Sequence, residues 1–179
     1  LDQSAMRDLR RLLEDWSGRD LRAQVLTGRG RSFCAGAALG DVAGQDWSEN
    51  PLTAACDALE AFPCPTIAAL NGGVYGGGME LALACDFRIG VTGMRAFAPP
   101  ARLGIHYDPA GIRRAIDRLG SQAARRIFLL AETFESTPGR TPSLTLANPF
   151  PGGGAISPNP GITIVEQGNM GGSGGFSRG

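Results

Sequence analysis

Three consecutive glycines and the glutamate that follows them are the residues of this sequence best suited to chemistry. Gly76, Gly77 and Gly78 come after a short apolar run, and Glu80 is the only charge in the apolar segment that they open. Glycines leave backbone N–H groups uncovered by side chains, so a ligand can approach closely. At the start of a helix these amides are unpaired and lie at the positive end of the helix dipole, which suits an oxyanion or a phosphate.

Two phosphate-binding patterns fit these glycines poorly. The phosphate loop requires a lysine after its glycines, and the sequence contains no lysine, because all 17 basic residues are arginine. The dinucleotide pattern opens a helix with G-x-G-x-x-G, and residues 73–78 do not match it cleanly. We therefore interpret the glycines as part of an oxyanion hole.

Ser32 to Leu39 form a second run of small residues, directly after a predicted strand. Active-site loops of α/β folds usually lie at such places, and small side chains again allow backbone amides to face a ligand. An ordinary tight loop packed under a helix is the alternative interpretation. The glycine cluster further along the chain favours the active-site loop.

Predicted helices and strands alternate around these two loops. Apolar residues at helical spacing predict helices over residues 1–16, 52–59, 112–119 and, with Ser121 as its cap, 121–131. Short apolar runs predict strands at residues 23–27, which we expect to be buried, and 86–91. We expect a strand, a tight turn and a buried helix over residues 65–84, and no regular element over residues 96–107. This alternation indicates an α/β fold.

Composition limits the class of protein and its partners. A formal net charge of zero and a pI near 6.8 give no electrostatic reason to expect nucleic acid or a membrane as partner. The four cysteines lack a paired C-x-x-C spacing, so we expect reduced core cysteines, no metal site and a cytoplasmic location. The sequence shows neither a signal peptide nor an apolar run of membrane-spanning length.

The composition changes near Thr137 and divides the chain into two parts. Residues 137–179 hold 11 of the 27 glycines and 6 of the 12 prolines, and they show no helical periodicity. We predict a core domain over residues 1–136 and a tail over residues 137–179 that is disordered, foreign or chimeric. The chain begins at Leu1 within the first predicted helix, so we expect a fragment.

Two motifs occur in a specific order. The first is Val25-Leu-Thr-Gly with Ser32-Phe-Cys-Ala-Gly-Ala-Ala-Leu39, and the second runs from Pro65-Thr-Ile-Ala-Ala-Leu-Asn-Gly through Gly-Gly-Gly-Met-Glu-Leu-Ala to Cys-Asp-Phe-Arg-Ile89. Together they resemble the crotonase, or enoyl-CoA hydratase/isomerase, superfamily over residues 1–135. The resemblance implies a spiral of stacked ββα units, here truncated at the N-terminus and without a recognisable C-terminal helical region.

The resemblance also implies a substrate and roles for residues. In that superfamily two backbone N–H groups hold the oxygen of an acyl-CoA thioester as it becomes an enolate, and the matching amides belong to Ala37 and Gly77. Glu80 matches one of the two glutamates that hydratases use for acid–base work, although stabilisation by the helix dipole alone is its structural alternative. Residues beside the two amides would contact the substrate: Ala35, Gly36, Leu39, Gly76 and Gly78. The resemblance implies no cofactor beyond the coenzyme A of the substrate, and a homotrimer or hexamer.

The sequence departs from the hydratase pattern at two positions. Pro100 stands where the second glutamate is expected, and Ala38 replaces the usual aspartate after the first motif. The segment from Pro99 to Ile112 resembles the branch that contains methylmalonyl-CoA decarboxylase. In that branch the tyrosine that matches Tyr107 lies near the carboxylate of the substrate, although a plain packed aromatic is the alternative.

We hypothesise an enzyme that acts on acyl-CoA thioesters through a stabilised enolate. Ala37 and Gly77 would bind the oxyanion, Glu80 would move the proton and Tyr107 would assist. Chemistry of the enoyl-CoA hydratase/isomerase type is the first interpretation, and a decarboxylase-like lyase is the alternative. An inactive acyl-CoA-binding pseudoenzyme is a third possibility, because the second glutamate is missing.

Overall fold

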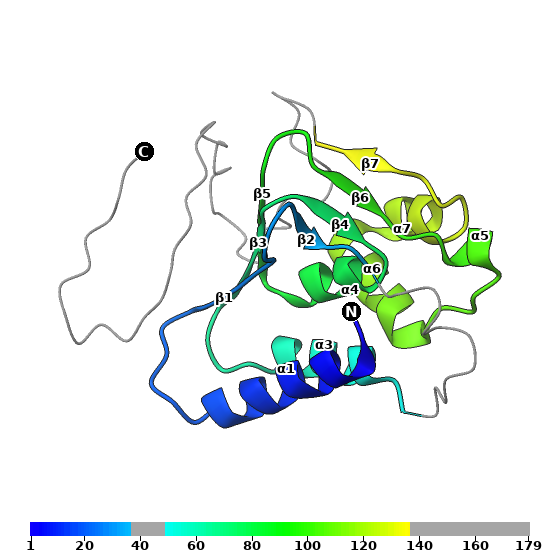
Figure 1. Cartoon of the computed structure of the whole chain (residues 1–179). Coiled ribbons are helices and arrows are strands. Elements are labelled where there is room, and N and C mark those ends of the chain that lie inside the picture. The colour runs from blue at the N-terminus through cyan, green and yellow to red at the C-terminus, as the bar shows by residue number, and fades with distance from the viewer. Residues whose placement is uncertain (37–48, 137–179) are drawn as a thin grey trace.

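Three successive strand–strand–helix units organise the computed structural model, which describes residues 1–36 and 49–136 (Figure 1). The helix α1 (Gln3–Trp16) precedes the first unit. The first unit is β1 (Gln24–Thr27), β2 (Ser32–Cys34) and α3 (Pro51–Glu60), and the second is β3 (Thr66–Leu70), β4 (Gly73–Tyr75) and α4 (Gly77–Ala84). The remaining elements are β5 (Phe87–Gly90), β6 (Arg95–Phe97), α5 (Pro100–Leu103), α6 (Pro109–Leu119), α7 (Ser121–Phe128) and β7 (Phe134–Glu135). No described helix is long and apolar enough to cross a bilayer.

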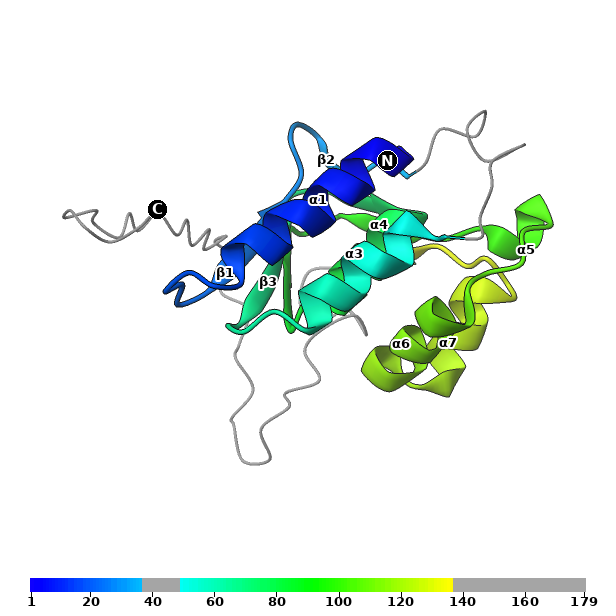
Figure 2. The same ribbon diagram turned by 90° about the horizontal axis from the view of Figure 1, so that it is seen from below.

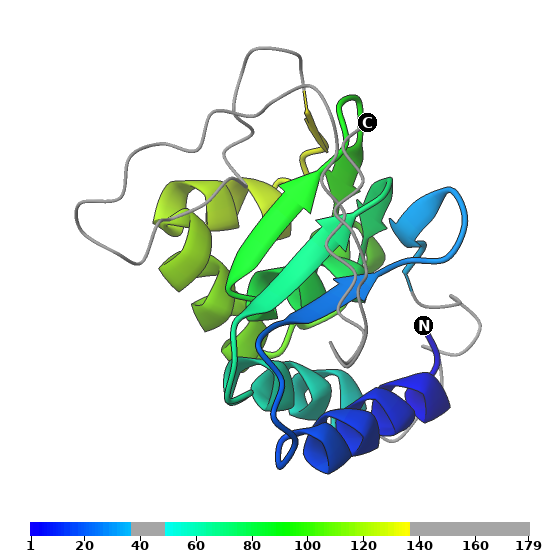
Figure 3. The same cartoon turned by 90° about the vertical axis from the view of Figure 1, so that its left-hand side faces the viewer.

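Each unit contributes one strand to each of two sheets. The first sheet has the order β1-β3-β5 and is entirely parallel, with Val25 opposite Ile67 and Ile67 opposite Phe87. The second has the order β2-β4-β6-β7, in which only β7 is antiparallel to its neighbour. Figure 3 shows the three strands of the first sheet side by side, with helices beside them. This arrangement is the ββα spiral that the resemblance implied, and it confirms the predicted α/β fold class.

The helix α4 lies at the centre of the described core. It contacts α3, α6, β2 and β4, and its residues from Gly78 to Ala84 are all buried. The helix α1 lies along α3, and α6 lies beside α7, as Figure 2 shows. A helix enclosed by neighbours on every side has no polar face, which explains why its sequence lacks amphipathic periodicity.

Several predicted elements are confirmed, and the elements that the sequence missed are all short. The first helix ends at Trp16, as predicted, with Ser17 as its cap. The helix α3 buries Ala55, Cys56 and Leu59, whereas its Leu52 is only partly buried. The sequence missed β2, β4, β6, α5 and β7, because elements of two to four residues are too short to show a period. The strand β1 is less buried than predicted, since its apolar residues are only partly covered and Thr27 is exposed.

The helices α6 and α7 differ from the prediction in two details. Ile116 is one of the apolar residues at helical spacing that predicted a helix over residues 112–119, but it is 42% exposed. The neighbouring Arg114 and Ala115 are buried, so the buried face of α6 is rotated away from Ile116. Ser121 is the first residue of α7 and not its cap, because the cap position belongs to Gly120 at φ 82°. That positive φ suits glycine, which has no Cβ to oppose it.

Gly78 sets how closely α4 approaches β2. A Cβ added at this buried position would overlap the Cβ of Cys34 and lie 2.7 Å from its sulfur. We predict that Gly78→Ala lowers the free energy of unfolding by about 1–3 kcal/mol through overpacking. Chemical denaturation measures the change. Gly18→Ala is the matched control and should be close to neutral, because nothing lies within 4 Å of a Cβ added there; equal stability of both variants would contradict the prediction.

Candidate active site

Glu80 is a buried carboxylate with a different partner on each oxygen. It lies in the first turn of α4, and its side chain is 2% exposed. Its Oε1 accepts a hydrogen bond from Nη1 of Arg114 at 2.7 Å, and its Oε2 accepts one from the hydroxyl of Tyr107 at 2.8 Å. The structure therefore brings together two of the predicted catalytic residues, Glu80 and Tyr107, and adds Arg114 to them.

Arg114 connects Glu80 to two acidic residues of α3. Its Nη2 lies 2.7 Å from Oδ1 of Asp57, and its Nε lies 3.1 Å from Oε1 of Glu60. Its side chain is 3% exposed. Arg114 lies three residues after Gly111, so the two residues share the buried face of α6. This spacing is the one weak signal for Arg114 in the sequence. The adjacent Arg113 is exposed, and the sequence alone does not distinguish the two arginines.

Burial and charge shift the ionisation of this cluster. Burial raises the pKa of Glu80, and the hydrogen bond from Tyr107 and the charge of Arg114 oppose that shift without cancelling it. Burial and the adjacent Glu80 carboxylate raise the pKa of Tyr107 well above its ordinary value. Burial disfavours the charge of Arg114, but hydrogen bonding to Glu60 and the surrounding negative groups raise its pKa overall. Arg114 therefore stays charged. The carboxyl group of Glu80 holds its proton more tightly than an exposed glutamate does.

Asp108 fixes the loop that presents Tyr107. Its Oδ1 accepts from the backbone N–H of Ala110 and so caps α6, and its Oδ2 accepts from Thr53 at 2.9 Å and from Asn50 at 3.2 Å. Asn50 is itself the cap of α3. Burial of Asp108 raises its pKa, but these hydrogen bonds outweigh that effect and lower it overall. The first turn of α3 thereby holds the start of α6 and the neighbouring Tyr107 in place.

Gly111 makes the contact between Tyr107 and Glu80 possible. A Cβ at this position would lie 2.6 Å from Cε1 of Tyr107 and 2.8 Å from Oε2 of Glu80. Any side chain here would separate the phenol from the carboxylate. The ring of Tyr107 is also fixed on another side by Phe128, at a centroid distance of 4.6 Å.

Gly77 is the first residue of α4 and remains partly exposed. Its N–H finds no acceptor among the described residues, as expected for the first turn of a helix. The N–H of Gly76, in contrast, donates to the carbonyl of Phe97 at 2.8 Å. Of these two adjacent amides, only the one of Gly77 is available to a ligand.

The two glycine-containing loops meet in the structure. A Cβ added to Gly76 would lie 3.6 Å from Cα of Gly36, and one added to Gly36 would lie 3.4 Å from the carbonyl of Tyr75. Both glycines have positive φ, at 56° and 86°. The predicted juxtaposition of the loops is therefore present at the last described residue of the first loop.

The other predicted site residues have varied positions. Ala37 and Leu39 lie outside the described residues, so the first oxyanion amide stays a prediction. Ala35 is exposed, whereas Gly78 is buried against Cys34. Pro100, which stands in place of the second glutamate, is buried at the start of α5.

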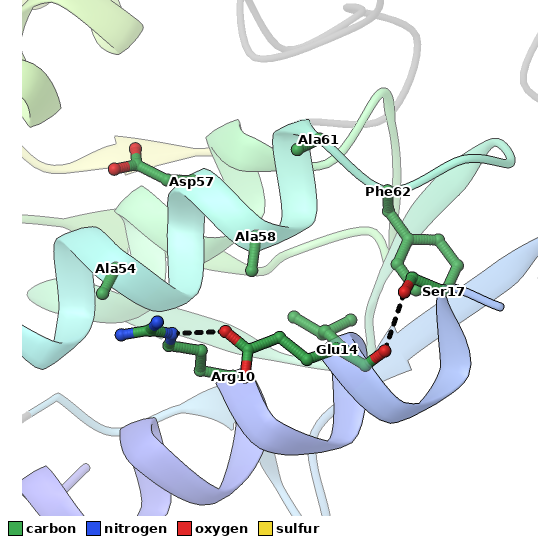
Figure 4. A pocket seen from close by; sticks show the side chains of 9 residues that line it. Arg10, Glu14, Ser17, Ala54, Asp57, Ala58, Ala61 and Phe62 are labelled. Atoms are coloured by element: carbon green, nitrogen blue, oxygen red, sulfur yellow. Dashed lines mark hydrogen bonds and ion pairs between the residues drawn. The ribbon is translucent and has the colours of Figure 1, made fainter.

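A groove of about 570 Å³ lies between α1 and α3. Arg10 and Glu14 of α1 form an ion pair on one side of it, and Asp57 and Phe62 lie on the other, as Figure 4 shows. Neither Gly77 nor Tyr107 lines this groove, and its carboxylates bind arginines of the protein. The residues suited to catalysis therefore lie in the cluster of Glu80, Tyr107 and Arg114, and not in the groove.

Comparison with known proteins identifies the family of the chain. The family model described as enoyl-CoA hydratase/isomerase matches residues 1–138. The chain belongs to the enoyl-CoA hydratase/isomerase family. Within that family it is 38% identical over 112 residues to a probable enoyl-CoA hydratase, echA6, of Mycobacterium bovis, and 36% identical over 139 residues to the enoyl-CoA hydratase ACTT6 of Alternaria alternata. These matches cover 62% and 75% of the chain.

Solved structures share the fold of this chain. The structure of Pseudomonas aeruginosa DspI superposes with a TM-score of 0.69 at 33% identity, and covers 75% of this chain and 54% of that one. A crystal structure whose protein is described as an enoyl-CoA hydratase/isomerase family member gives a TM-score of 0.70 at 30% identity. The chain spans about half the length of its relatives: it covers 46% of echA6 and 46% of ACTT6.

The raised pKa of Glu80 predicts a pH dependence of stability. A carboxyl whose pKa is higher in the folded than in the unfolded state stabilises the fold below its unfolded pKa of about 4.3, and this stabilisation is lost as pH rises through the folded pKa. We expect the free energy of unfolding of the wild type to fall relative to that of Glu80→Gln over this window. Denaturation at a series of pH values measures it.

A matched control separates this effect from the titration of exposed carboxylates. Glu14→Gln removes a half-exposed glutamate of α1 and should leave the shape of the pH profile close to that of the wild type. A Glu80→Gln profile parallel to the wild-type profile at every pH would show that Glu80 is not perturbed.

Proposed function

We propose that this chain catalyses acyl-CoA chemistry of the enoyl-CoA hydratase/isomerase type through an enolate bound at the N-terminus of α4. The proposal rests on the unpaired N–H of the partly exposed Gly77, which lies one helical turn before a buried glutamate that accepts a hydrogen bond from Tyr107. Family membership supports an acyl-CoA thioester as the substrate.

The Gly77 amide would stabilise the negative charge that develops on the thioester oxygen. A fixed donor in a site that excludes water needs no reorganisation during the reaction and is therefore worth more than the same donor in water. The positive end of the α4 dipole acts in the same direction. Ala37 would supply the second amide, on the loop that meets this one at Gly36 and Gly76.

Glu80 and Tyr107 would move the proton of the reaction. The raised pKa of Glu80 makes its carboxylate a stronger base than an exposed glutamate, which favours acceptance of a proton from the substrate. Contact with substrate is proposed for the residues beside the two amides, which are Ala35, Gly36, Leu39, Gly76 and Gly78. No cofactor besides the substrate's coenzyme A is proposed, and a homotrimer or hexamer in the cytoplasm stays a prediction.

The lack of a second glutamate makes a decarboxylase-like lyase the second candidate. The helix α5, which begins at Pro100, contains no carboxylate, and two-carboxylate hydration of a double bond would require one there. Decarboxylation needs the oxyanion site and a proton donor, and the phenol of Tyr107 can donate. Incubation with crotonyl-CoA and, separately, with methylmalonyl-CoA distinguishes hydration from release of carbon dioxide.

Substitution of Gly77 tests the proposed oxyanion site. Gly77→Pro removes the N–H at a helix position that tolerates proline, and Gly77→Ala is its matched control, since both add a Cβ beside Leu52 and only alanine keeps the donor. We expect the proline variant to be slower than the alanine variant by about 10²–10³. The measurement is deuterium exchange at the α-carbon of a saturated acyl-CoA in D₂O.

Exchange at the α-carbon reports enolate formation whichever final reaction the protein catalyses. Equal rates in the two folded variants would show that the Gly77 amide is not the donor. A wild-type chain that binds a nonreactive acyl-CoA analogue in calorimetry but does not exchange the proton would favour the inactive binder.

A further inference from the structure

We propose that Glu60 of α3 is a positioning residue of the reaction: its carboxylate occupies Arg114, so that this cation does not hold the negative charge of Glu80 too firmly for proton transfer. The inference rests on the proposed function, in which the carboxylate of Glu80 accepts a proton from the substrate. Three features support it: the contacts of Arg114, the place of Glu60 at the end of its helix, and the direction in which charge moves during enolisation.

The guanidinium of Arg114 is bound more extensively by α3 than by Glu80. Its Nη1 donates to Oε1 of Glu80 at 2.7 Å. Both oxygens of Glu60 face it, since Oε2 accepts from Nη2 at 3.1 Å and Oε1 lies 3.1 Å from Nε. Asp57 accepts a further hydrogen bond from Nη2 at 2.7 Å. The positive charge is therefore divided between Glu80 and two acidic residues of α3.

Glu60 lies where its own helix disfavours a negative charge. It is the last residue of α3, and this helix has no basic residue in its last turn. The negative end of the helix dipole lies there and opposes a carboxylate. The compensating cations come from α6, as Arg114 and, at 3.9 Å from Oε1, Arg118. Burial lowers the pKa of Arg114, and hydrogen bonding to Glu60 is the largest of the effects that raise it overall. Contact with α6 therefore accounts for the acidic residue at this end of α3.

The proposed reaction moves negative charge away from Glu80. As the α-C–H bond of the acyl-CoA breaks, its proton passes to the carboxylate, and its electron pair passes into the enolate, whose oxygen accepts from the Gly77 amide. A cation bound to Glu80 alone would stabilise the carboxylate before the transfer and lose most of that interaction afterwards, which raises the barrier. The carboxylate of Glu60 gives Arg114 a partner both before and after the transfer, so less stabilisation is lost when Glu80 becomes neutral.

Other charged groups also act on Glu80. The charged or titratable side chains of the neighbouring helices and of the loop before α6 are Asp57, Glu60 and Cys56 of α3, Arg114 and Arg118 of α6, and Tyr107 and Asp108 of the loop. The strands β2 and β4 carry no charged residue, and their titratable side chains are Cys34 and Tyr75. Arg88 of β5 donates to carbonyls at the far end of α4.

Glu60 is the acidic neighbour whose charge is best suited to a test. Burial is the main cause of the raised pKa of Glu80, and Asp108 adds to it, but Asp108 also caps α6 and holds the loop of Tyr107. The side chain of Asp57 is 62% exposed, whereas that of Glu60 is 34% exposed. Water and salt screen the more exposed charge more strongly, so Glu60 should act more strongly on the buried pair than Asp57 does.

The pH dependence of α-proton exchange in Glu60→Gln tests the inference. Loss of this negative charge removes a repulsion on Glu80 and leaves Arg114 more available to it, and both effects lower the pKa of Glu80. The rise of the exchange rate with pH should therefore move to lower pH by about 0.5–1.5 units. The rate above that rise should fall about 2–10-fold, because Glu80 becomes a weaker base. Binding of a nonreactive acyl-CoA analogue should not change.

Two further variants and a second measurement complete the test. Asp57→Asn should move the profile in the same direction by less, and Glu14→Gln of α1, which is remote from Glu80 in the fold, should not move it. A ¹³C NMR titration of the Glu80 carboxyl, assigned with Glu80→Gln, reports the same shift without turnover.

The outcomes separate this inference from the proposed function. A wild type that exchanges the proton, with an exchange profile and a carboxyl titration that do not move to lower pH in Glu60→Gln, would overturn the role of Glu60 alone. A wild type that binds the analogue and exchanges no proton at any pH would overturn the proposed function and, with it, the role of Glu60 in the reaction.

Discussion

The described structure depends on one buried ion pair, between Glu80 and Arg114. A carboxylate in an apolar core is strongly unfavourable unless a cation and further hydrogen bonds compensate it, and removal of one partner from such a pair costs about 3–5 kcal/mol. Arg114 comes from α6, and the acidic groups that complete its coordination come from α3. The requirement to neutralise one charge on α4 therefore joins three helices that the sheets alone would not fix relative to one another.

The helix α4 combines two requirements that usually conflict. Its N-terminus must stay open for the Gly77 amide to meet a ligand, whereas the rest of the helix is enclosed. Glycine at positions 76, 77 and 78 reconciles them, since the backbone turns at a positive φ, exposes one amide and then packs directly on β2. The glycine cluster is thus as much a packing device as a binding one.

The sequence predicted the residues whose signal is local, and it missed those whose role depends on distant partners. The glycines, Glu80 and Tyr107 lie in short motifs that can be recognised without a structure. Arg114 and Asp108 resemble many other charges on helix surfaces until α3 is placed against them. The apolar spacing over residues 112–119 predicted the helix α6 but not that Ile116 would be exposed, because periodicity identifies an amphipathic helix and leaves small rotations of its buried face undetermined.

The spacing of these partners along the chain has a consequence for the order of folding. Glu80 and Arg114 are separated by 34 positions, and Arg114 and Asp57 by 57. During synthesis the carboxylate leaves the ribosome well before its cation, so α4 lacks its charge partner when the first two ββα units are complete. Burial of an ionised Glu80 and docking of α6 must then occur as one cooperative event, which makes assembly of the catalytic cluster a late step of folding and not a property of an early spiral intermediate.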